Sequence, residues 1–413
     1  MFDSLRVREY RILWSYSFLT SLAMWSMLVG RAWLAYDLTG STLWVGLVTF
    51  AGRLSFVLAP LGGILADRLD RRLLLSYCSF LSAAVAALLA GLAFAGVVEV
   101  WQVMLITLLL GVIRTPDRPA SDALMAKAVK GETLLNAVAL NRLARFGPQA
   151  IGPSIAAPLI VLAGEGAVFL VGAMFYLLTA VQVLRLRTEA RGPSRSDEGV
   201  LKNLREGIAY AASVPALALL MVVVAIHCGF TMSFDSLFPA YSREVLGKGG
   251  AVFGFLSAGI GFGRVLGTLG MASLTNSGRQ GRWFLLAAIF SGFAPILLVV
   301  TPTLASAFFA TLIMGVGTEA FMTMSNTMIL QVVPDGLRGR VSSLYLFMTQ
   351  GLMAAANVLL ALLADLWLLN LVFLVPALGY LALLAVISLS RPRMRTIYRR
   401  GSLVPAQPEP APS

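Results

Sequence analysis

Long apolar stretches recur from one end of the chain to the other, and short polar segments separate them. The apolar residues form continuous runs and do not alternate with polar ones, which favours helices over the strands of a membrane barrel. A helix needs about 20 apolar residues to cross the roughly 30 Å hydrocarbon core of a bilayer. The pattern predicts an all-helical membrane protein with twelve spans, at residues 12–36, 43–66, 73–95, 101–123, 134–162, 166–186, 216–241, 250–273, 283–301, 303–331, 341–363 and 367–389.

The composition supports the same class of protein. Only 13% of the 413 residues are charged and the mean hydropathy is +0.83, whereas a soluble protein carries about a quarter charged residues. The two cysteines, Cys78 and Cys228, lie in separate apolar runs, and His227 is the only histidine. The sequence contains no metal-ligand spacing, no GxxxxGKS or GxxxxGKT nucleotide loop and no catalytic constellation. We therefore expect no cofactor and no enzymatic activity.

One long polar interval, residues 188–207, divides the chain, with six predicted helices before it and six after it. Segments 128–140 and 332–344 are similar and occupy matching positions, which indicates two pseudo-symmetric halves around a central cavity. We expect four parts: a first half at 1–187, a linker at 188–215, a second half at 216–390, and a basic, then Pro-rich and disordered tail at 391–413.

Within the linker, Leu201, Leu204 and Ile208 repeat at helical spacing, with Lys202 and Arg205 on the opposite side. This pattern predicts a short helix that lies on the cytoplasmic face of the membrane. An ordinary solvated linker helix is the alternative.

Basic residues are distributed unevenly between the two sides of the predicted membrane. With both termini in the cytoplasm, the cytoplasmic segments hold most of the 32 Lys and Arg residues, and the outer loops hold only Arg243 and Lys248. The positive-inside rule therefore predicts cytoplasmic termini, with residues 1–11 retained as a cytoplasmic segment. The same asymmetry explains the net charge of +12 as membrane-surface charge, so no nucleic-acid partner is expected.

A charged block, GGILADRLDRR at residues 62–72, interrupts the apolar pattern between the second and third predicted helices. It resembles the signature loop of the major facilitator superfamily through Gly63, Leu65, Ala66, Asp67, Arg68, Asp70, Arg71 and Arg72. The stretches AYDLTGST, NAVALN and VPDGLRGRV resemble a bacterial exporter branch of that superfamily, which includes enterobactin exporters and macrolide efflux proteins. The resemblance covers nearly the whole chain. It implies the twelve-helix major facilitator fold in the bacterial inner (plasma) membrane.

The resemblance implies a gating role for the charged block. Asp67 would accept hydrogen bonds from the N-terminus of helix eleven, where negative charge is favoured, and so latch the cytoplasmic side. A loop that is basic only for topology is the alternative. The expected gating residues are Gly63, Asp67, Arg68, Arg71 and Arg72.

Two further positions match patterns of antiporters in this family. In helix five, Gly152 and Pro153 fit a motif whose small residues allow close helix packing, with generic kinking as the alternative. In helix four, Arg114 stands where the antiporters keep an arginine linked to proton coupling. Asp117 and Arg118 depart from the amide and glycine that usually surround that arginine.

Seven arginines fall inside apolar runs: Arg31, Arg53, Arg114, Arg118, Arg142, Arg145 and Arg264. A charge at the centre of a bilayer is costly, so such residues usually face a cavity and serve function. The first half contains only one deep acid, Asp117, which suggests an electropositive cavity that favours anions, because guanidinium matches carboxylate and phosphate groups. The expected substrate-binding residues are Arg53, Arg114, Arg142, Arg145, Gln149, His227 and Arg264. The alternatives are structural pairing and snorkelling for the arginines, and a hydrogen-bonded core position for His227.

Three intramembrane acids are candidates for proton coupling: Asp117, Asp235 and Glu319. For each of them a purely structural role is an equally open reading.

The first functional hypothesis is a monomeric secondary transporter that exports a small anionic or polyoxygenated molecule, such as a siderophore, by alternating access and proton antiport. Its expected partners are the cargo, protons and membrane lipids. The alternatives are multidrug or macrolide efflux, an uptake symporter, and a membrane scaffold that transports nothing.

Overall fold

The computed structural model describes residues 3–54, 58–129, 133–186, 200–274 and 280–390, and these residues contain helices and no strand. The first part of the chain forms η1 (Asp3–Arg6), α1 (Arg8–Thr39), α2 (Thr42–Leu54), α3 (Ala59–Arg68), α4 (Arg71–Phe94), α5 (Val100–Ile113), α6 (Asp117–Ala128), α7 (Thr133–Phe146) and α8 (Pro148–Val183). The second part forms α9 (Val200–Ser213), α10 (Pro215–Phe230), η2 (Asp235–Leu237), α11 (Phe238–Ala240), η3 (Tyr241–Val245), α12 (Gly250–Leu274), α13 (Gln280–Val300), α14 (Leu304–Val332), α15 (Asp335–Leu366) and α16 (Leu369–Ser390).

The all-helical membrane fold predicted from the sequence is confirmed. Ten segments are long and apolar enough to cross a bilayer. One of them, Ala139–Val183, contains two spans, because Gly164 takes the non-helical angles φ 77 and ψ 177 and the chain reverses there. Helices α2 and α3 together form a further span, which gives twelve.

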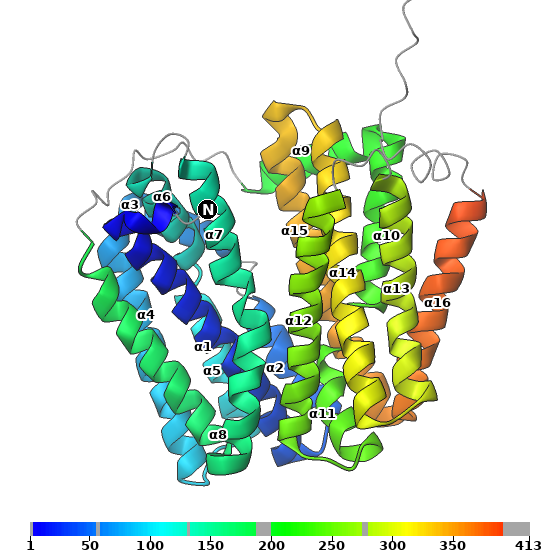
Figure 1. Cartoon of the computed structure of the whole chain (residues 1–413), viewed down its shortest axis with the longest axis horizontal. Coiled ribbons are helices and arrows are strands. Elements are labelled where there is room, and N and C mark those ends of the chain that lie inside the picture. Colours follow the sequence, from blue (N-terminus) through cyan, green and yellow to red (C-terminus); the bar gives the residue numbers. More distant parts are fainter. Residues whose placement is uncertain (1–2, 55–57, 130–132, 187–199, 275–279, 391–413) are drawn as a thin grey trace, which may run out of the picture.

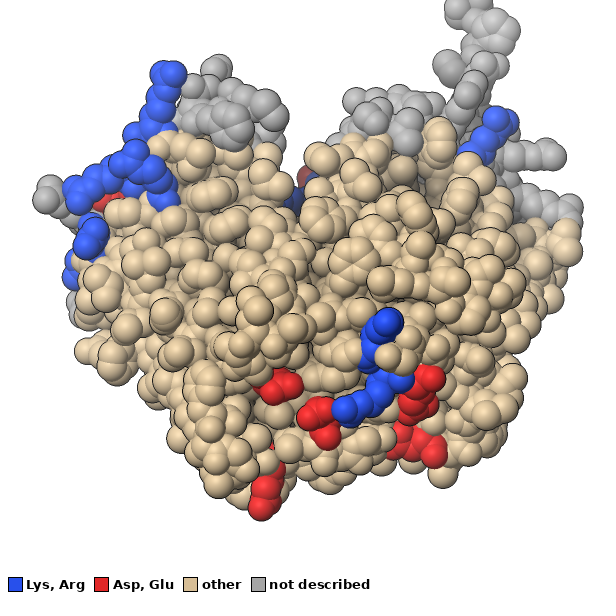
Figure 2. Space-filling model, turned by 60° about the horizontal axis from the view of Figure 1, so that its bottom comes forward, with Lys and Arg blue, Asp and Glu red and all other residues tan. Residues whose placement is uncertain are grey.

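The helices form two bundles that lie side by side, α1–α8 in one and α10–α16 in the other (Figure 1). We call the end of the molecule that carries the N-terminus and α9 the inner end, and the opposite end the outer end. The bundles lie together at the outer end and diverge toward the inner end. The space-filling view in Figure 2 brings the outer end forward. It shows a few acidic and basic side chains close together there, and an indentation between the bundles at its upper edge.

The hydrophobic core has the same asymmetry. One continuous cluster of buried residues crosses from bundle to bundle, and includes Trp33 and Val45 from the first bundle with Phe253 and Phe373 from the second. Toward the inner end each bundle has a cluster of its own, around Tyr10 in the first and Phe321 in the second. Since apolar burial is the main favourable term in packing, the bundles are held together chiefly over their outer halves.

Helix α9 lies within the predicted linker and packs on the inner end of the second bundle. Glu206 forms a 2.5 Å ion pair with Arg340 of α15. The backbone of Gly207 passes so close to the carbonyl oxygen of Arg340 that an added Cβ would lie 2.8 Å from it. The side chains of Leu201, Lys202 and Leu204, residues 188–199 and the tail at 391–413 lie outside the described residues. The membrane contact of this helix and the four-part division therefore stay predictions.

Three spans that the sequence predicts as continuous contain non-helical residues in the structure. They occur at Leu58 before α3, between the end of α5 at Ile113 and the start of α6 at Asp117, and between the end of α10 at Phe230 and the start of η2 at Asp235. Pro60 and Pro116 stand beside the first two of these breaks, and a proline cannot continue the backbone hydrogen bonding of a helix. The breaks matter because charged residues stand at them.

Candidate functional site: the charged interface between the bundles

The first of these residues, Arg53, lies next to last in α2, and its Nη2 donates to Oδ2 of Asp235 in η2 at 2.7 Å. Arg53 is the eleventh residue after Thr42, which at 1.5 Å per residue places it about 16 Å from the outer end of α2, near the middle of a bilayer. The two side chains are 15% and 29% exposed. A partly buried ion pair therefore joins the bundles at mid-depth.

A second cross-bundle contact lies close by. Nη1 of Arg264 in α12 donates to Oε1 of Gln149 in α8 at 3.2 Å. One turn earlier, an added Cβ at Gly261 would collide with the Gln149 carbonyl oxygen, so the two helices touch backbone to backbone. Arg264 also interacts electrostatically with Glu319 of α14 and with Arg53. We call Arg53, Asp235, Arg264, Glu319 and Gln149 the central cluster.

At the outer end, Asp365 of α15 caps the N-terminus of α2 across the bundle interface. Its carboxylate accepts hydrogen bonds from the backbone N–H groups of Thr42 at 2.7 Å and Leu43 at 3.1 Å, and from the hydroxyls of Ser41 and Thr42. Helix N-termini leave N–H groups without intrahelical partners and favour negative charge, so this cap is stabilising only while the bundles touch.

The end of α1 makes a second outer contact with the segment after α11. Arg243 pairs with Asp37 at 2.9 Å and lies over the ring of Trp33 at 5.5 Å. The Tyr36 hydroxyl donates to Glu244 at 2.6 Å. Trp33 in turn covers Gly250, where an added Cβ would lie 2.8 Å from the indole. The outer end is therefore closed by polar and packing contacts from both bundles.

Two predicted site residues, Arg114 and Asp117, form a polar group inside the first bundle. Arg114 caps the end of α5 and pairs with Asp117 at 2.7 Å, and its guanidinium lies 4.8 Å from the centre of the Tyr176 ring. Tyr16 of α1 lies near Asp117 and near Ser79 of α4, but its buried hydroxyl makes no hydrogen bond with either. The group is placed between four spans of one bundle and not between the bundles.

Arg142 and Arg145 of α7 have different surroundings, although they share one helix face in the sequence pattern. Arg145 donates to Asp122 of α6 at 2.7 Å and to the Ser121 hydroxyl at 2.8 Å. Arg118 lies 3.9 Å from the same carboxylate. Arg142 is exposed, and no carboxylate partner is found for it among the described residues.

The sequence offers two roles for His227, a substrate-binding residue or a hydrogen-bonded core residue. In the structure it is wholly buried inside the second bundle, which fits the core role. Its Nδ1 lies 3.1 Å from the Tyr380 hydroxyl, and its ring is stacked 3.8 Å from the ring of Phe321. The described contacts of the His227 ring are therefore with residues of the second bundle.

The gating loop also differs from expectation. Oδ1 of Asp67 accepts a hydrogen bond from Nη2 of Arg71 at 3.0 Å, within the same loop, instead of from the N-terminus of helix eleven. Arg72 donates to the carbonyl oxygen of Leu186 at the end of the first bundle, and Arg68 is exposed. Gly63 has nothing within 4 Å of an added Cβ. The residue that needs to be glycine is Gly62, where a Cβ would collide with the Thr115 carbonyl oxygen.

In helix α8 the structure places Gly152 against α1. An added Cβ there would lie 2.8 Å from the Cβ of Trp25, and the Ser26 hydroxyl donates to the Gly152 carbonyl oxygen at 3.1 Å. Pro153 follows inside the helix. The pair therefore lies at a close packing point between two spans of the first bundle.

The expectation of an electropositive cavity built on the whole arginine set is too simple. Arg53, Arg114 and Arg145 each have a carboxylate within 2.7 Å, and Glu319 lies near Arg264 without forming an ion pair with it. A comparison of charges within the first half cannot show this balance, because Asp235, the partner of Arg53, comes from the second half of the chain. Among the described residues, Arg31 and Arg142 remain without a carboxylate partner; Arg31 donates to the Met27 carbonyl oxygen. No group of three or more possible metal ligands occurs in the described part of the chain.

Comparison with known protein families identifies the chain. A family model described as "transmembrane secretion effector" matches residues 1–409. The chain belongs to this family of major facilitator transporters. It is accordingly a membrane transporter and not an enzyme.

Curated relatives of this transporter are bacterial efflux proteins. It is 23% identical to macrolide efflux protein A of Streptococcus pyogenes over 209 residues, which are 50% of this chain and 52% of the relative. The chain thus spans about half the length of the macrolide efflux relatives that it matches. It is 26% identical to the enterobactin exporter EntS of Shigella flexneri over 317 residues, 75% of this chain and 73% of the relative.

Solved structures share the fold of this transporter at low identity. A POT family transporter in complex with 5-aminolevulinic acid superposes with a TM-score of 0.73 at 12% identity, over 94% of this chain and 96% of the other. A bacterial homologue of the lysosomal transporter Spinster, in an inward-facing and occupied conformation, gives a TM-score of 0.69 at 15% identity, over 96% and 92% of the two chains.

Proposed function

We propose that this protein is a secondary active exporter of a small anionic or polyoxygenated molecule of the siderophore type, which works by alternating access and exchanges its cargo for protons. In this proposal it lies in the bacterial plasma membrane with its inner end in the cytoplasm. The observation that carries the proposal is the central cluster. It joins the two bundles at mid-depth in a form that is closed at the outer end.

The distribution of contacts supports alternating access. The capping of α2 by Asp365 of the other bundle, which we call the trans cap, lies at the outer end. The contact of Arg243 with Asp37 and Trp33 lies there too. The proposed cytoplasmic latch residue, Asp67, is paired within its own loop. This combination fits a state that receives cargo from the inner end. In the opposite state, the outer contacts would break and Asp67 would reach the N-terminus of α15, which is the eleventh span.

The acids of the central cluster support proton exchange. Asp235 holds Arg53 across the interface, and Glu319 faces Arg264. A proton on either acid would remove its attraction for the arginine, while an anionic cargo would compete for the same guanidinium. Cargo and proton would then act on one set of contacts, which is the minimum that coupling requires.

Two observations support an anionic cargo. Nη1 of Arg53 is buried without a hydrogen-bond partner, so the arginine has donors left over beside its ion pair. Arg31 and Arg142 add positive charge that no carboxylate balances among the described residues. The similarity to the enterobactin exporter supports the same cargo class and the outward direction.

Efflux of a macrolide-like drug is the second candidate function. The similarity to macrolide efflux protein A favours it, and so does the near balance of arginines and acids at the central cluster. A weakly charged or cationic cargo would meet little repulsion from such a balanced site.

Ligand-dependent thermal stabilisation of the purified transporter tests the proposal. The panel sets catecholate siderophores and other organic anions against macrolides and lipophilic cations. A ligand at 100 times its dissociation constant stabilises the folded state by about 2.7 kcal/mol, which a melting curve detects. Stabilisation by anions, lost in Arg53→Ala, is expected. Stabilisation by macrolides alone would move drug efflux to first place. Accumulation of the stabilising ligand in inside-out vesicles then establishes export, and accumulation only in right-side-out vesicles would overturn it.

A further inference from the structure

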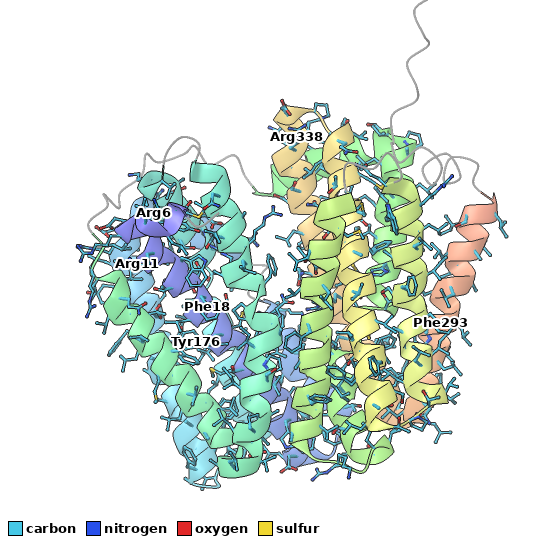
Figure 3. The ribbon with its side chains drawn as sticks, in the orientation of Figure 1. Arg6, Arg11, Phe18, Tyr176, Phe293 and Arg338 are labelled. Carbon is cyan, nitrogen blue, oxygen red and sulfur yellow. The ribbon has the colours of Figure 1, made fainter. Side chains whose placement is uncertain are left out.

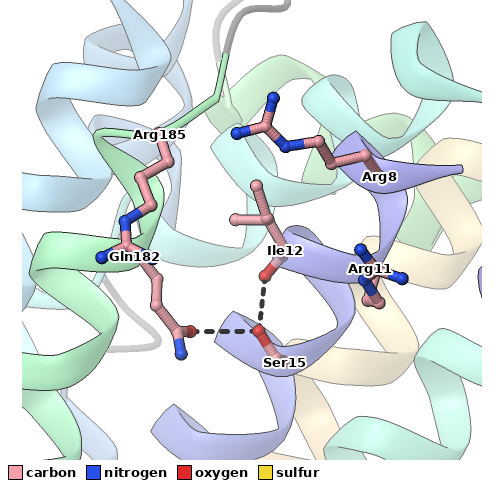
Figure 4. A pocket seen from close by; sticks show the side chains of 6 residues that line it. All are labelled: Arg8, Arg11, Ile12, Ser15, Gln182 and Arg185. Carbon is pink, nitrogen blue, oxygen red and sulfur yellow. Dashed lines mark hydrogen bonds between the residues drawn. The ribbon is translucent and has the colours of Figure 1, made fainter.

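A basic pocket lies at the inner end of the first bundle, away from the central cluster. It is lined by Arg8, Arg11, Ile12 and Ser15 from the first turns of α1, and by Gln182 and Arg185 from the end of α8 (Figure 4). Its volume is about 240 Å³, several times the roughly 30 Å³ share of one water molecule.

The charge of this pocket is of one sign. Three of its six lining residues are arginines and none is acidic. No carboxylate partner is found for Arg8, Arg11 or Arg185 among the described residues, in contrast to Arg53, Arg114 and Arg145 of the interior. Figure 4 shows Arg8 reaching from α1 toward α8, and Arg185 running along α8 beside Gln182. The Ser15 hydroxyl donates to Oε1 of Gln182 at 3.0 Å, so the floor of the pocket is polar and ordered.

The surface next to the pocket is apolar on the side away from the inner end. Leu178 and Val181 lie one turn before Gln182 and Arg185 on the same face of α8, and are 46% and 47% exposed. On α1, Trp14 and Phe18 are stacked with ring centres 5.4 Å apart. Figure 3 places Phe18 along α1, farther from the inner end than Arg11. Aromatic residues at this level are typical of the boundary between headgroups and acyl chains.

We propose that Arg8, Arg11 and Arg185 bind the phosphodiester headgroup of an anionic phospholipid in the leaflet at the inner end, with its acyl chains along Leu178, Val181 and Phe18. Guanidinium groups bind phosphate oxygens bidentately, and a bound headgroup would bridge α1 and α8 at the inner end of the first bundle. Arginines without carboxylate partners lie next to exposed apolar residues here. This combination fits a lipid better than a free anion, because a free anion needs no apolar surface. Basic pockets between spans on the cytoplasmic side bind such headgroups.

The test is titration of the purified, full-length transporter with phosphatidylglycerol, phosphatidylcholine or inorganic phosphate, with bound lipid counted by native mass spectrometry and stability followed by thermal melting. The wild type is expected to bind phosphatidylglycerol at least tenfold more tightly than phosphatidylcholine. Each arginine is expected to contribute about fivefold, so that Arg11→Gln with Arg185→Gln weakens phosphatidylglycerol binding about 25-fold. Arg282→Gln, an exposed arginine at the inner end of the second bundle, is the matched control and should bind phosphatidylglycerol like the wild type.

A second variant guards against loss of folding or topology in the arginine variants. Ser15→Leu fills the floor of the pocket and keeps every positive charge, and it is also expected to weaken phosphatidylglycerol binding. Unchanged binding in both Ser15→Leu and the double arginine variant would overturn the proposal. Equal stabilisation by inorganic phosphate and phosphatidylglycerol would overturn the lipid assignment and identify a site for a free anion.

Discussion

Arg53 and Asp235 join the two bundles through a 2.7 Å ion pair, although 182 positions separate them in the sequence. Asp235 stands at the start of η2, just after the break that follows the end of α10 at Phe230. Discontinuous helices occur in many transporters, and their ends carry the polar groups that bind cargo and ions.

This ion pair should show strong energetic coupling. Removing one partner of a fully buried pair costs about 3–5 kcal/mol; because Arg53 and Asp235 are partly exposed, we expect about 2–3 kcal/mol for Arg53→Met or Asp235→Asn alone. The double variant should lose much less than the sum of the single losses, since it leaves no unpaired charge. Thermal unfolding of the three variants measures the coupling, and additive losses would show that the pair is not formed.

The trans cap should stabilise the outer-closed state. Asp365→Ala removes the acceptor for the Thr42 and Leu43 N–H groups, and loss of a cap costs about 0.5–2 kcal/mol. We expect the melting temperature to fall accordingly. Glu165→Ala removes an acid from the same end that makes no such cap, and should leave the melting temperature unchanged. An equal fall in both variants would mean that only net charge at the outer end matters.

Close packing at Gly254 should be needed for outer closure. An added Cβ there would lie 2.7 Å from the Cβ of Ala157 in the other bundle. Gly254→Leu is therefore expected to wedge the bundles apart. A wedge that costs about 1.4 kcal/mol should raise maleimide labelling of Val45→Cys, a buried position of the outer core, about tenfold.

Gly351→Leu is the control for this experiment, because nothing lies within 4 Å of an added Cβ at Gly351. Maleimide should label Val45→Cys at the same rate with Gly351→Leu as without it. Slow labelling in Gly254→Leu would contradict the interface described above.

Replacement of His227 should affect stability and leave cargo binding intact. His227→Phe keeps the stack on Phe321 but loses the hydrogen bond with Tyr380, which is worth about 1 kcal/mol. Tyr380→Phe should cost a similar amount, and the double variant little more than either. Loss of cargo-induced stabilisation in His227→Phe, with the protein still folded, would return His227 to the binding site.

The spans were predictable from the sequence because hydropathy reports burial in lipid, and the fold followed from the charged loop at Asp67 and its neighbours. The breaks were not predicted, since the apolar run continues through Arg114 and Pro116 and a hydropathy window averages over both. Pro60 and Pro116 were the available signals for two of the breaks.

The partners of the site residues were harder to predict. Asp235 and Asp365 complete contacts that begin in the other half of the chain, and periodicity within one helix cannot show which bundle a side chain faces. The same limit explains His227. A polar residue inside an apolar run indicates a buried partner, but whether that partner is a cargo or Tyr380 depends on helices far away in the sequence.

Alternating access itself is tested most directly by two distances, measured in a cysteine-free background by double electron–electron resonance between spin labels. One pair is placed at the outer end, on Leu38 and Lys248, and the other at the inner end, on Ala126 and Gln331, all of which are exposed. We expect Asp235→Asn, or addition of cargo with protons, to lengthen the outer distance and shorten the inner one together. Outer and inner distances that stay fixed, or that change in the same direction, would contradict a transporter that alternates between an outer-closed and an inner-closed state.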